Sequence, residues 1–228
     1  MRKFLIALFA LFCGCALPPK APPPAAPRTP VTEPSGPFER YDVVASHVEI
    51  RVYREGPMAQ LGHNHLISSD ALKGSIQLRD PMSDTRFTLE LPLDSLVVDD
   101  PALRATAGPD FAREVPQADR DGTRRNMLGA SVLDMARQPV LRLSVDSLAG
   151  GPAEFQAQLR IGLRGEERVI GVPLTLEAGG GKLSAHASFR LRHADLGLTP
   201  FTVALGALRV RDEIDFDCRL EAKRASTP

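Results

Sequence analysis

Apolar and polar residues alternate along most of the chain after residue 37, and this period of two constrains the fold more than any other feature. Side chains of a β-strand point to opposite faces of a sheet in turn, so a strand with one buried face shows this alternation. In residues 154–165, Phe155, Leu159 and Ile161 alternate with glutamine and arginine. The pattern recurs at residues 47–53, 74–80, 86–98, 140–148, 168–176, 183–193 and 213–222.

About eight amphipathic strands with few helical patterns between them predict a mainly β fold built on an antiparallel sheet. Glycine-containing turns at residues 164–167 and 178–182 predict hairpins. A sheet of this size leaves unpaired edges and an exposed apolar face unless it closes into a barrel or folds into a sandwich. Pro92 and Pro173, inside two of the expected strands, predict local edges, bulges or strand starts.

One segment, at about residues 119–138, departs from the strand pattern. It carries apolar residues at helical spacing and ends before Pro139. We therefore expect a helix there, lying across one end or face of the sheet.

Residues 1–14 predict an export signal peptide. A basic start, Arg2 and Lys3, precedes an apolar run that is shorter than the about 20 residues needed for a membrane-spanning helix. The Gly14–Cys15 step resembles a bacterial lipobox, in which the cysteine becomes lipidated. This predicts a lipoprotein anchored in a membrane and facing the periplasm. The alternative is a signal cleaved further along the chain, which gives a secreted protein.

Residues 15–37 are predicted to form a lipidated N-terminus and a proline-rich tether, because repeated prolines favour extended backbone that cannot pack a core. The barrel domain is expected over residues 38–224, with a tail at residues 225–228.

If Cys15 carries lipid, Cys218 has no partner in the mature chain, which excludes a disulfide within one chain. The 28 basic residues balance the 28 acidic ones, so the charge does not favour nucleic acid as a partner.

The order of these elements resembles the YceI-like family of exported bacterial proteins, whose members have a lipocalin-like β-barrel and bind polyisoprenoid-type lipids. The likeness covers about residues 41–223. It rests on a series of short stretches, at residues 41–53, 61–67, 89–100, 126–148, 157–176 and 188–222. The resemblance implies an antiparallel lipocalin-like barrel of about eight strands with one helical segment.

The stretch "LGHNHLI", residues 61–67, holds two of the five histidines. If it is a strand, His63 and His65 project to the same side and have the spacing of a metal-binding pair. A third ligand must then come from elsewhere in the fold, so a metal site is the less favoured interpretation. The other interpretations are hydrogen bonds to neighbouring groups, or contact with the polar head group of a ligand.

An enzyme is not expected. Ser68, Ser69 and Asp70 follow the histidines, but no G-x-S-x-G elbow is present. Cys218 alternates with core residues, which indicates a buried thiol, and the Asp99–Asp100 pair is interpreted as a charged turn.

The apolar face carries the functional prediction. A small barrel is either filled by its own side chains or encloses a ligand, and both alternatives stay open from the residues alone. The family resemblance implies a pocket for a long isoprenoid-type lipid, polyprenyl or quinone-like, that the protein binds, carries or stores in the cell envelope. We expect no other cofactor, and a homodimer stays open. A structural or interaction lipoprotein with a filled barrel is the alternative. The expected lining is Leu89, Leu91, Leu143, Val145, Leu159, Ile161, Leu174, Phe189, Leu191 and Phe216.

Overall fold

The computed structural model describes residues 36–226, so the predicted signal peptide, Cys15 and nearly all of the tether lie outside the described residues. Its strands are β1 (Glu39–Glu55), β2 (His65–Ser69), β3 (Lys73–Leu78), β4 (Arg86–Pro92), β5 (Val97–Val98), β6 (Val140–Gly150), β7 (Glu154–Leu163), β8 (Glu166–Gly179), β9 (Lys182–Arg192), β10 (Thr202–Val203) and β11 (Leu208–Arg224). Its α-helices are α1 (Pro101–Thr106) and α2 (Gln117–Leu128). Short 3-10 turns are η1 (Ala59–Leu61), η2 (Met82–Asp84), η3 (Leu93–Ser95), η4 (Pro109–Phe111), η5 (His193–Leu196) and η6 (Ala204–Gly206).

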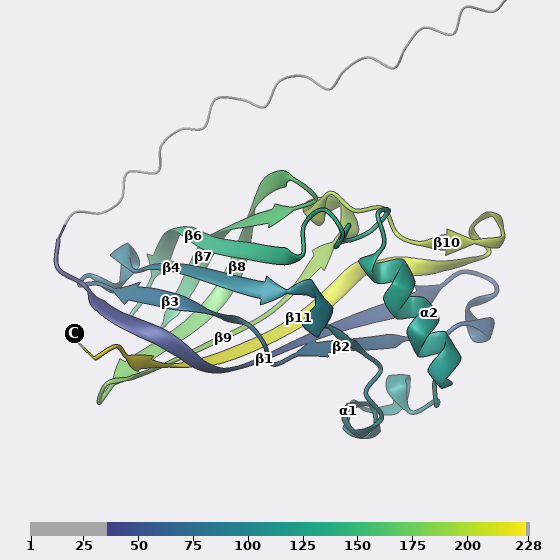
Figure 1. The fold of residues 1–228 in the computed structure, drawn as a ribbon, viewed down its shortest axis with the longest axis horizontal. Coiled ribbons are helices and arrows are strands. Elements are labelled where there is room, and N and C mark those ends of the chain that lie inside the picture. Colours follow the sequence, from purple (N-terminus) through teal and green to yellow (C-terminus); the bar gives the residue numbers. More distant parts are fainter. Residues whose placement is uncertain (1–35, 227–228) are drawn as a thin grey trace, which may run out of the picture. The chain divides into compact units, whose positions relative to one another are not determined.

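Eight of the strands form a closed antiparallel barrel, as the alternation and the family resemblance predicted. The ring runs β1, β3, β4, β6, β7, β8, β9 and β11, and the pairing of β11 with β1 closes it (Figure 1). The long strand β1 pairs with β3 near its start and with β2 near its end. The short strands β5 and β10 extend β2 and β11 outside the ring.

Two hairpins follow directly from the turn residues. Arg164 and Gly165 join β7 to β8 with φ values of 55° and 78°, and Gly180 and Gly181 join β8 to β9 with φ values of 57° and 74°. Two successive positive φ angles are typical of the tight turn whose twist matches that of paired strands. Both predicted hairpins are therefore present.

Strands β8 and β9 separate along part of their length. Their pairing runs from Gly179 and Lys182 only as far as Thr175 and His186. Beyond this point β8 pairs with β7 alone, and β9 pairs with β11 alone. Pro173 lies in the part of β8 that has lost its second partner, which agrees with the local edge predicted for it.

The helical prediction was right in kind but wrong in extent. Helix α2 ends at Leu128, because Gly129 adopts extended backbone (φ −71°, ψ 168°). The rest of the expected helix forms compact turns, in which Asp134 has a φ of 48° and its amide donates to the Gly129 carbonyl. Helix α1 was not predicted. It is capped by the Asp100 side chain, which accepts from the amides of Ala102 and Leu103.

The apolar faces pack into two clusters of buried side chains inside the barrel. One cluster is centred on β6–β9 and includes Tyr41, Phe155 and Leu183. The other lies beneath α2 and includes Leu93, Val98 and Leu128. Neither helix within residues 36–226 is long and apolar enough to cross a membrane.

Candidate functional site

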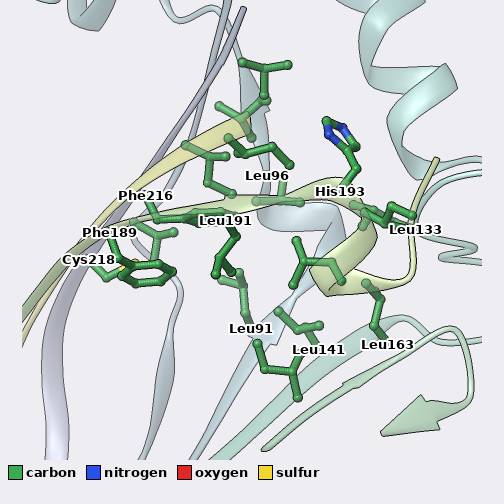
Figure 2. A pocket seen from close by; sticks show the side chains of 18 of the residues that line it. Leu91, Leu96, Leu133, Leu141, Leu163, Phe189, Leu191, His193, Phe216 and Cys218 are labelled. Carbon is green, nitrogen blue, oxygen red and sulfur yellow. The ribbon is translucent and has the colours of Figure 1, made fainter. Parts of the chain in front are cut away.

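A cavity of about 440 Å³ lies between the two clusters of packed side chains, so the barrel is not filled. Its walls are almost entirely aliphatic and aromatic, and come from β1, β4, β6, β7, β8, β9 and β11. Figure 2 shows Phe189, Phe216 and Cys218 grouped on one side of this cavity, with Leu133 and His193 on the other. The rings of Phe189 and Phe216 are stacked, with centroids 5.1 Å apart.

Nine of the ten side chains expected on the apolar wall lie around this cavity, and the exception is Val145. Val145 is instead buried in the β6–β9 cluster. The small inward residues Ala157, Ala185 and Ala187 also line the cavity, which explains how a slot remains between larger neighbours. Whether these residues contact a ligand stays a prediction.

Several lining residues were not identified from the sequence. Met127 and Leu133, from the end of α2 and the turns after it, cover one side of the cavity. Leu198 and Phe201, from the connection between η5 and β10, cover another. Met127 and Leu133 were predicted to belong to a helix across the sheet, and Leu198 and Phe201 lie outside the alternating strands, so none of them was assigned to the wall of the barrel.

A polar network centred on Asp99 holds His65, which lines the cavity. This carboxylate is completely buried, and accepts from His65 Nδ1 at 2.6 Å, from the Leu66 amide at 2.8 Å and from the Arg104 guanidinium at 2.6 Å. Burial alone raises the pKa of Asp99, but the hydrogen bonds from His65 and Leu66 and the charge of Arg104 outweigh it, so the pKa is lowered. Asp99, predicted to belong to a charged turn, is thus a buried and ionised carboxylate at the connection between β5 and α1.

This network fixes the orientation of the His65 ring. Because Asp99 is ionised it can only accept, so Nδ1 of His65 is the donating nitrogen. Within residues 36–226 this is the one hydrogen bond that the His65 ring makes, and His65 lines the cavity. His65 is thus an oriented polar side chain among mostly apolar lining residues.

His63 lies beside His65, with ring centroids 6.3 Å apart, and also lines the cavity. It precedes β2, so the two histidines do not share a strand as the sequence had suggested. Burial lowers the pKa of His63, and the charges of Arg113 and His65 lower it further. At neutral pH His63 is therefore an uncharged ring that can both donate and accept.

A metal centre finds no further support at this pair. Within residues 36–226, no group of three or more His, Cys, Asp or Glu side chains is arranged to hold a metal ion. Nδ1 of His65 is already bonded to Asp99. Of the other histidines, His47 and His186 bond to the Asp70 and Asp217 carboxylates, and His193 Nδ1 lies 2.8 Å from the Asp212 carbonyl oxygen.

Cys218 lies in the cavity wall beside Phe216 (Figure 2). Burial raises the pKa of its thiol to about 12, and the charge of Asp217 contributes. A thiol with this pKa is protonated at neutral pH and is a poor nucleophile. The expectation of a buried, inactive cysteine agrees with this environment.

Some of the residues that line the cavity are exposed, so the cavity reaches the surface. Exposed side chains at this opening come from the end of α2 (Asn126) and from the chain between η5 and β10 (Thr199, Phe201). Gly197, with a φ of 68°, lies directly against the Arg168 guanidinium of β8. The chain after η5 therefore closes part of the gap between the two strands.

The sequence matches no family model and no curated protein. Among solved structures, BcnA from Burkholderia cenocepacia matches with a TM-score of 0.55 at 11% identity, over 78% of this chain and 96% of BcnA. A polyisoprenoid-binding domain from Saccharophagus degradans, implicated in plant cell wall breakdown, matches with a TM-score of 0.54 at 15% identity, over 81% of this chain and 98% of that domain.

A YceI protein from Campylobacter jejuni gives a TM-score of 0.48 at 10% identity, over 68% of this chain and 82% of that protein. The likeness to BcnA and to the Saccharophagus domain shows that this chain shares their fold. The resemblance found in the sequence is confirmed at the level of the fold.

Proposed function

We propose that the barrel binds a long isoprenoid-type lipid, polyprenyl or quinone-like, and carries or stores it in the cell envelope. The observation that carries the proposal is the empty apolar cavity of about 440 Å³ inside the barrel. Its volume is within the range of about 300–1,000 Å³ that is typical of pockets for small hydrophobic ligands. The Saccharophagus domain, which has the same fold, is described as polyisoprenoid-binding.

Chain burial would supply most of the affinity. Each buried methylene contributes about 0.8 kcal/mol, so several isoprene units held by the walls suffice for tight binding without any charged partner. The stacked rings of Phe189 and Phe216 offer a flat apolar surface for the chain. The side chains expected to contact it are the nine predicted residues that line the cavity.

The polar wall would orient the ligand. His65, held by Asp99, and the neighbouring His63 provide hydrogen-bonding atoms at one place in the apolar surface. A lipid with a polar head would be bound with that head at the histidines and its chain along the barrel. This arrangement favours a ligand with an alcohol, carbonyl or similar head over a pure hydrocarbon.

The alternative, a structural or interaction lipoprotein with a filled barrel, is less well supported because the barrel contains a cavity. We expect a binding protein and no enzyme, since the thiol is protonated and the His65–Asp99 pair has no hydroxyl nucleophile bonded to it within residues 36–226. Export and a lipid anchor at Cys15 belong to the proposal as expectations from the N-terminal sequence.

The proposal is tested by filling the cavity. Ala185→Phe places a ring in the space, whereas Ala178→Phe places the same ring at an exposed position on β8 as a control. Both proteins are titrated with a fluorescent polyprenyl analogue, and their melting temperatures are compared with that of wild type. We expect Ala185→Phe to weaken binding by at least about tenfold and Ala178→Phe to leave it unchanged. Equal affinities in all three folded proteins would place the ligand outside the barrel.

A further inference from the structure

Exposed apolar side chains gather at one end of the barrel. Most of the large apolar residues that are strongly exposed within residues 36–226 belong to two short segments, residues 56–62 and 201–207. The segments are adjacent, because the Met58 amide donates to the Ala207 carbonyl at 2.9 Å. Both lie at the β10 end of the barrel (Figure 1). We call this surface the apolar tip, formed by Met58, Leu61, Phe201, Val203 and Leu205.

Packing within the chain does not explain the apolar tip. Leu205 is fully exposed and has a φ of 55° and a ψ of 33°, in the left-handed region that glycine and asparagine favour. An exposed leucine in this conformation is unfavourable for the isolated fold and gains no buried contact. Contacts within residues 36–226 therefore give no reason for an apolar side chain at this position.

The apolar tip continues into the cavity. Phe201 and Val203 belong to the exposed tip and also line the cavity, so one apolar surface leads from outside the barrel to its interior. A hydrophobic ligand that entered here would remain in contact with apolar side chains throughout. A continuous apolar surface of this kind is suited to a partner whose own interior is apolar and contains hydrophobic molecules.

Two arginines flank the tip with their charges uncompensated. Arg54 donates to the Gly62 carbonyl, and Arg113 donates to the Gln60 carbonyl at 2.9 Å. Neither guanidinium forms an ion pair with any acidic side chain of residues 36–226. Arginines fixed next to an apolar surface are suited to the phosphates of anionic lipids.

We propose that the apolar tip inserts into the interface of a bilayer containing anionic phospholipid and brings the opening of the cavity onto the membrane. The lipid ligand would then pass between bilayer and barrel without crossing water, a role that rests on the proposed function. A second copy of the chain is a weaker candidate for the occupant. A stable interface uses about 20–30 residues from each partner, and the tip consists of two short segments.

The experiment uses residues 16–228, which contain all of residues 36–226 but lack Cys15. Flotation with vesicles of phosphatidylethanolamine and phosphatidylglycerol measures membrane binding. The double variant Leu61→Ser/Leu205→Asn removes two tip residues that do not line the cavity. Val97→Ser and Val169→Ser alter valines that are 47% and 48% exposed elsewhere, and serve as matched controls.

Wild type and both control variants should float with the vesicles, and the double variant should bind at least about tenfold more weakly. Asparagine accepts the backbone conformation of Leu205, so the double variant should melt no lower than wild type. No flotation of wild type would overturn the proposal, as would an equal loss in the control variants. Dimerisation of wild type that the double variant abolishes, without vesicle binding, would show that a second copy covers the tip.

Affinity for a polyprenyl analogue in solution separates this proposal from the proposed function. The double variant should bind the analogue as wild type does, but extract it from vesicles more slowly. Vesicle binding by a wild-type protein that binds no analogue would refute the lipid-carrier function and leave membrane docking standing.

Discussion

Replacement of Asp99 by asparagine tests the buried network behind the candidate head-group site. Asp99 is 0% exposed, and its partner Arg104 is only 6% exposed. Asparagine keeps the shape of the side chain and tolerates the positive φ of 55° at this position, so the substitution removes the charge with little backbone effect. It leaves the Arg104 guanidinium buried without its counter-ion and directs an amide at His65 Nδ1.

Breaking one side of a buried ion pair costs about 3–5 kcal/mol, a large fraction of the about 5–15 kcal/mol by which domains are stable. We therefore expect Asp99→Asn to lower the free energy of unfolding in urea at pH 7 by at least about 3 kcal/mol. Asp70→Asn is a matched control. Asp70 lies 2.6 Å from His47, the same distance as in the His65–Asp99 pair, but its side chain is 78% exposed. Asp70→Asn should lower the free energy of unfolding by less than about 1 kcal/mol.

Two further measurements separate charge from packing. Arg104→Met in the Asp99→Asn background removes the orphaned charge, so the double variant should be more stable than Asp99→Asn alone. Because the pKa of Asp99 is lowered in the folded protein, its contribution is present above about pH 4 and is lost as the pH falls through the folded-state pKa. The difference in the free energy of unfolding between wild type and Asp99→Asn should therefore decrease at acidic pH. Equal losses in Asp99→Asn and Asp70→Asn at pH 7 would refute the reasoning.

Three other substitutions or reactions follow from the same structure. Cys218 has a thiol pKa of about 12, so at pH 8 it should react with a disulfide reagent at least about a hundredfold more slowly in the folded chain than in the chain unfolded by urea. Equal reaction rates in the two states would contradict the burial of Cys218. Gly74→Ala should lower the free energy of unfolding by more than about 3 kcal/mol, because a β-carbon at this position meets the Thr88 carbonyl and comes within 2.9 Å of Leu89 Cα. Gly180→Ala is the control, because a β-carbon there has no neighbour within 4 Å, and it should cost only about 1 kcal/mol in the same urea titration. His65→Phe should weaken binding of a polyprenol about tenfold but leave unchanged the binding of a hydrocarbon with the same chain and no hydroxyl group. An equal loss of affinity for the polyprenol and the hydrocarbon would refute a head-group role of His65.

The strands of the second half of the chain could be predicted from sequence because their order and turns are local. β7, β8 and β9 are consecutive hairpin strands, and each turn between them is marked by glycine. The split of residues 86–98 into β4, η3 and β5 was not predicted. Pro92 ends β4, and the apolar pattern continues through η3 because Leu93 and Leu96 are buried in a turn rather than in a strand.

The polar part of the site depends on contacts between distant positions, which alternation does not reveal. Asp99 lies 34 residues after His65, and the pairing of β2 with β5 is what brings them together. Its neighbour Asp100 is a helix cap, so two adjacent acidic residues have unrelated roles. The extent of α2 was overestimated because the apolar spacing continues past Gly129, although the backbone leaves the helix there.

Identification of the molecule inside the barrel tests the central claim most directly. The protein is purified from its native cells without added lipid, examined by native mass spectrometry, and then extracted for lipid analysis. We predict that an isoprenoid-type lipid leaves with the protein, and that Ala185→Phe purified in parallel carries much less of it. An empty wild-type barrel that also fails to take up added polyprenol or quinone would contradict the account.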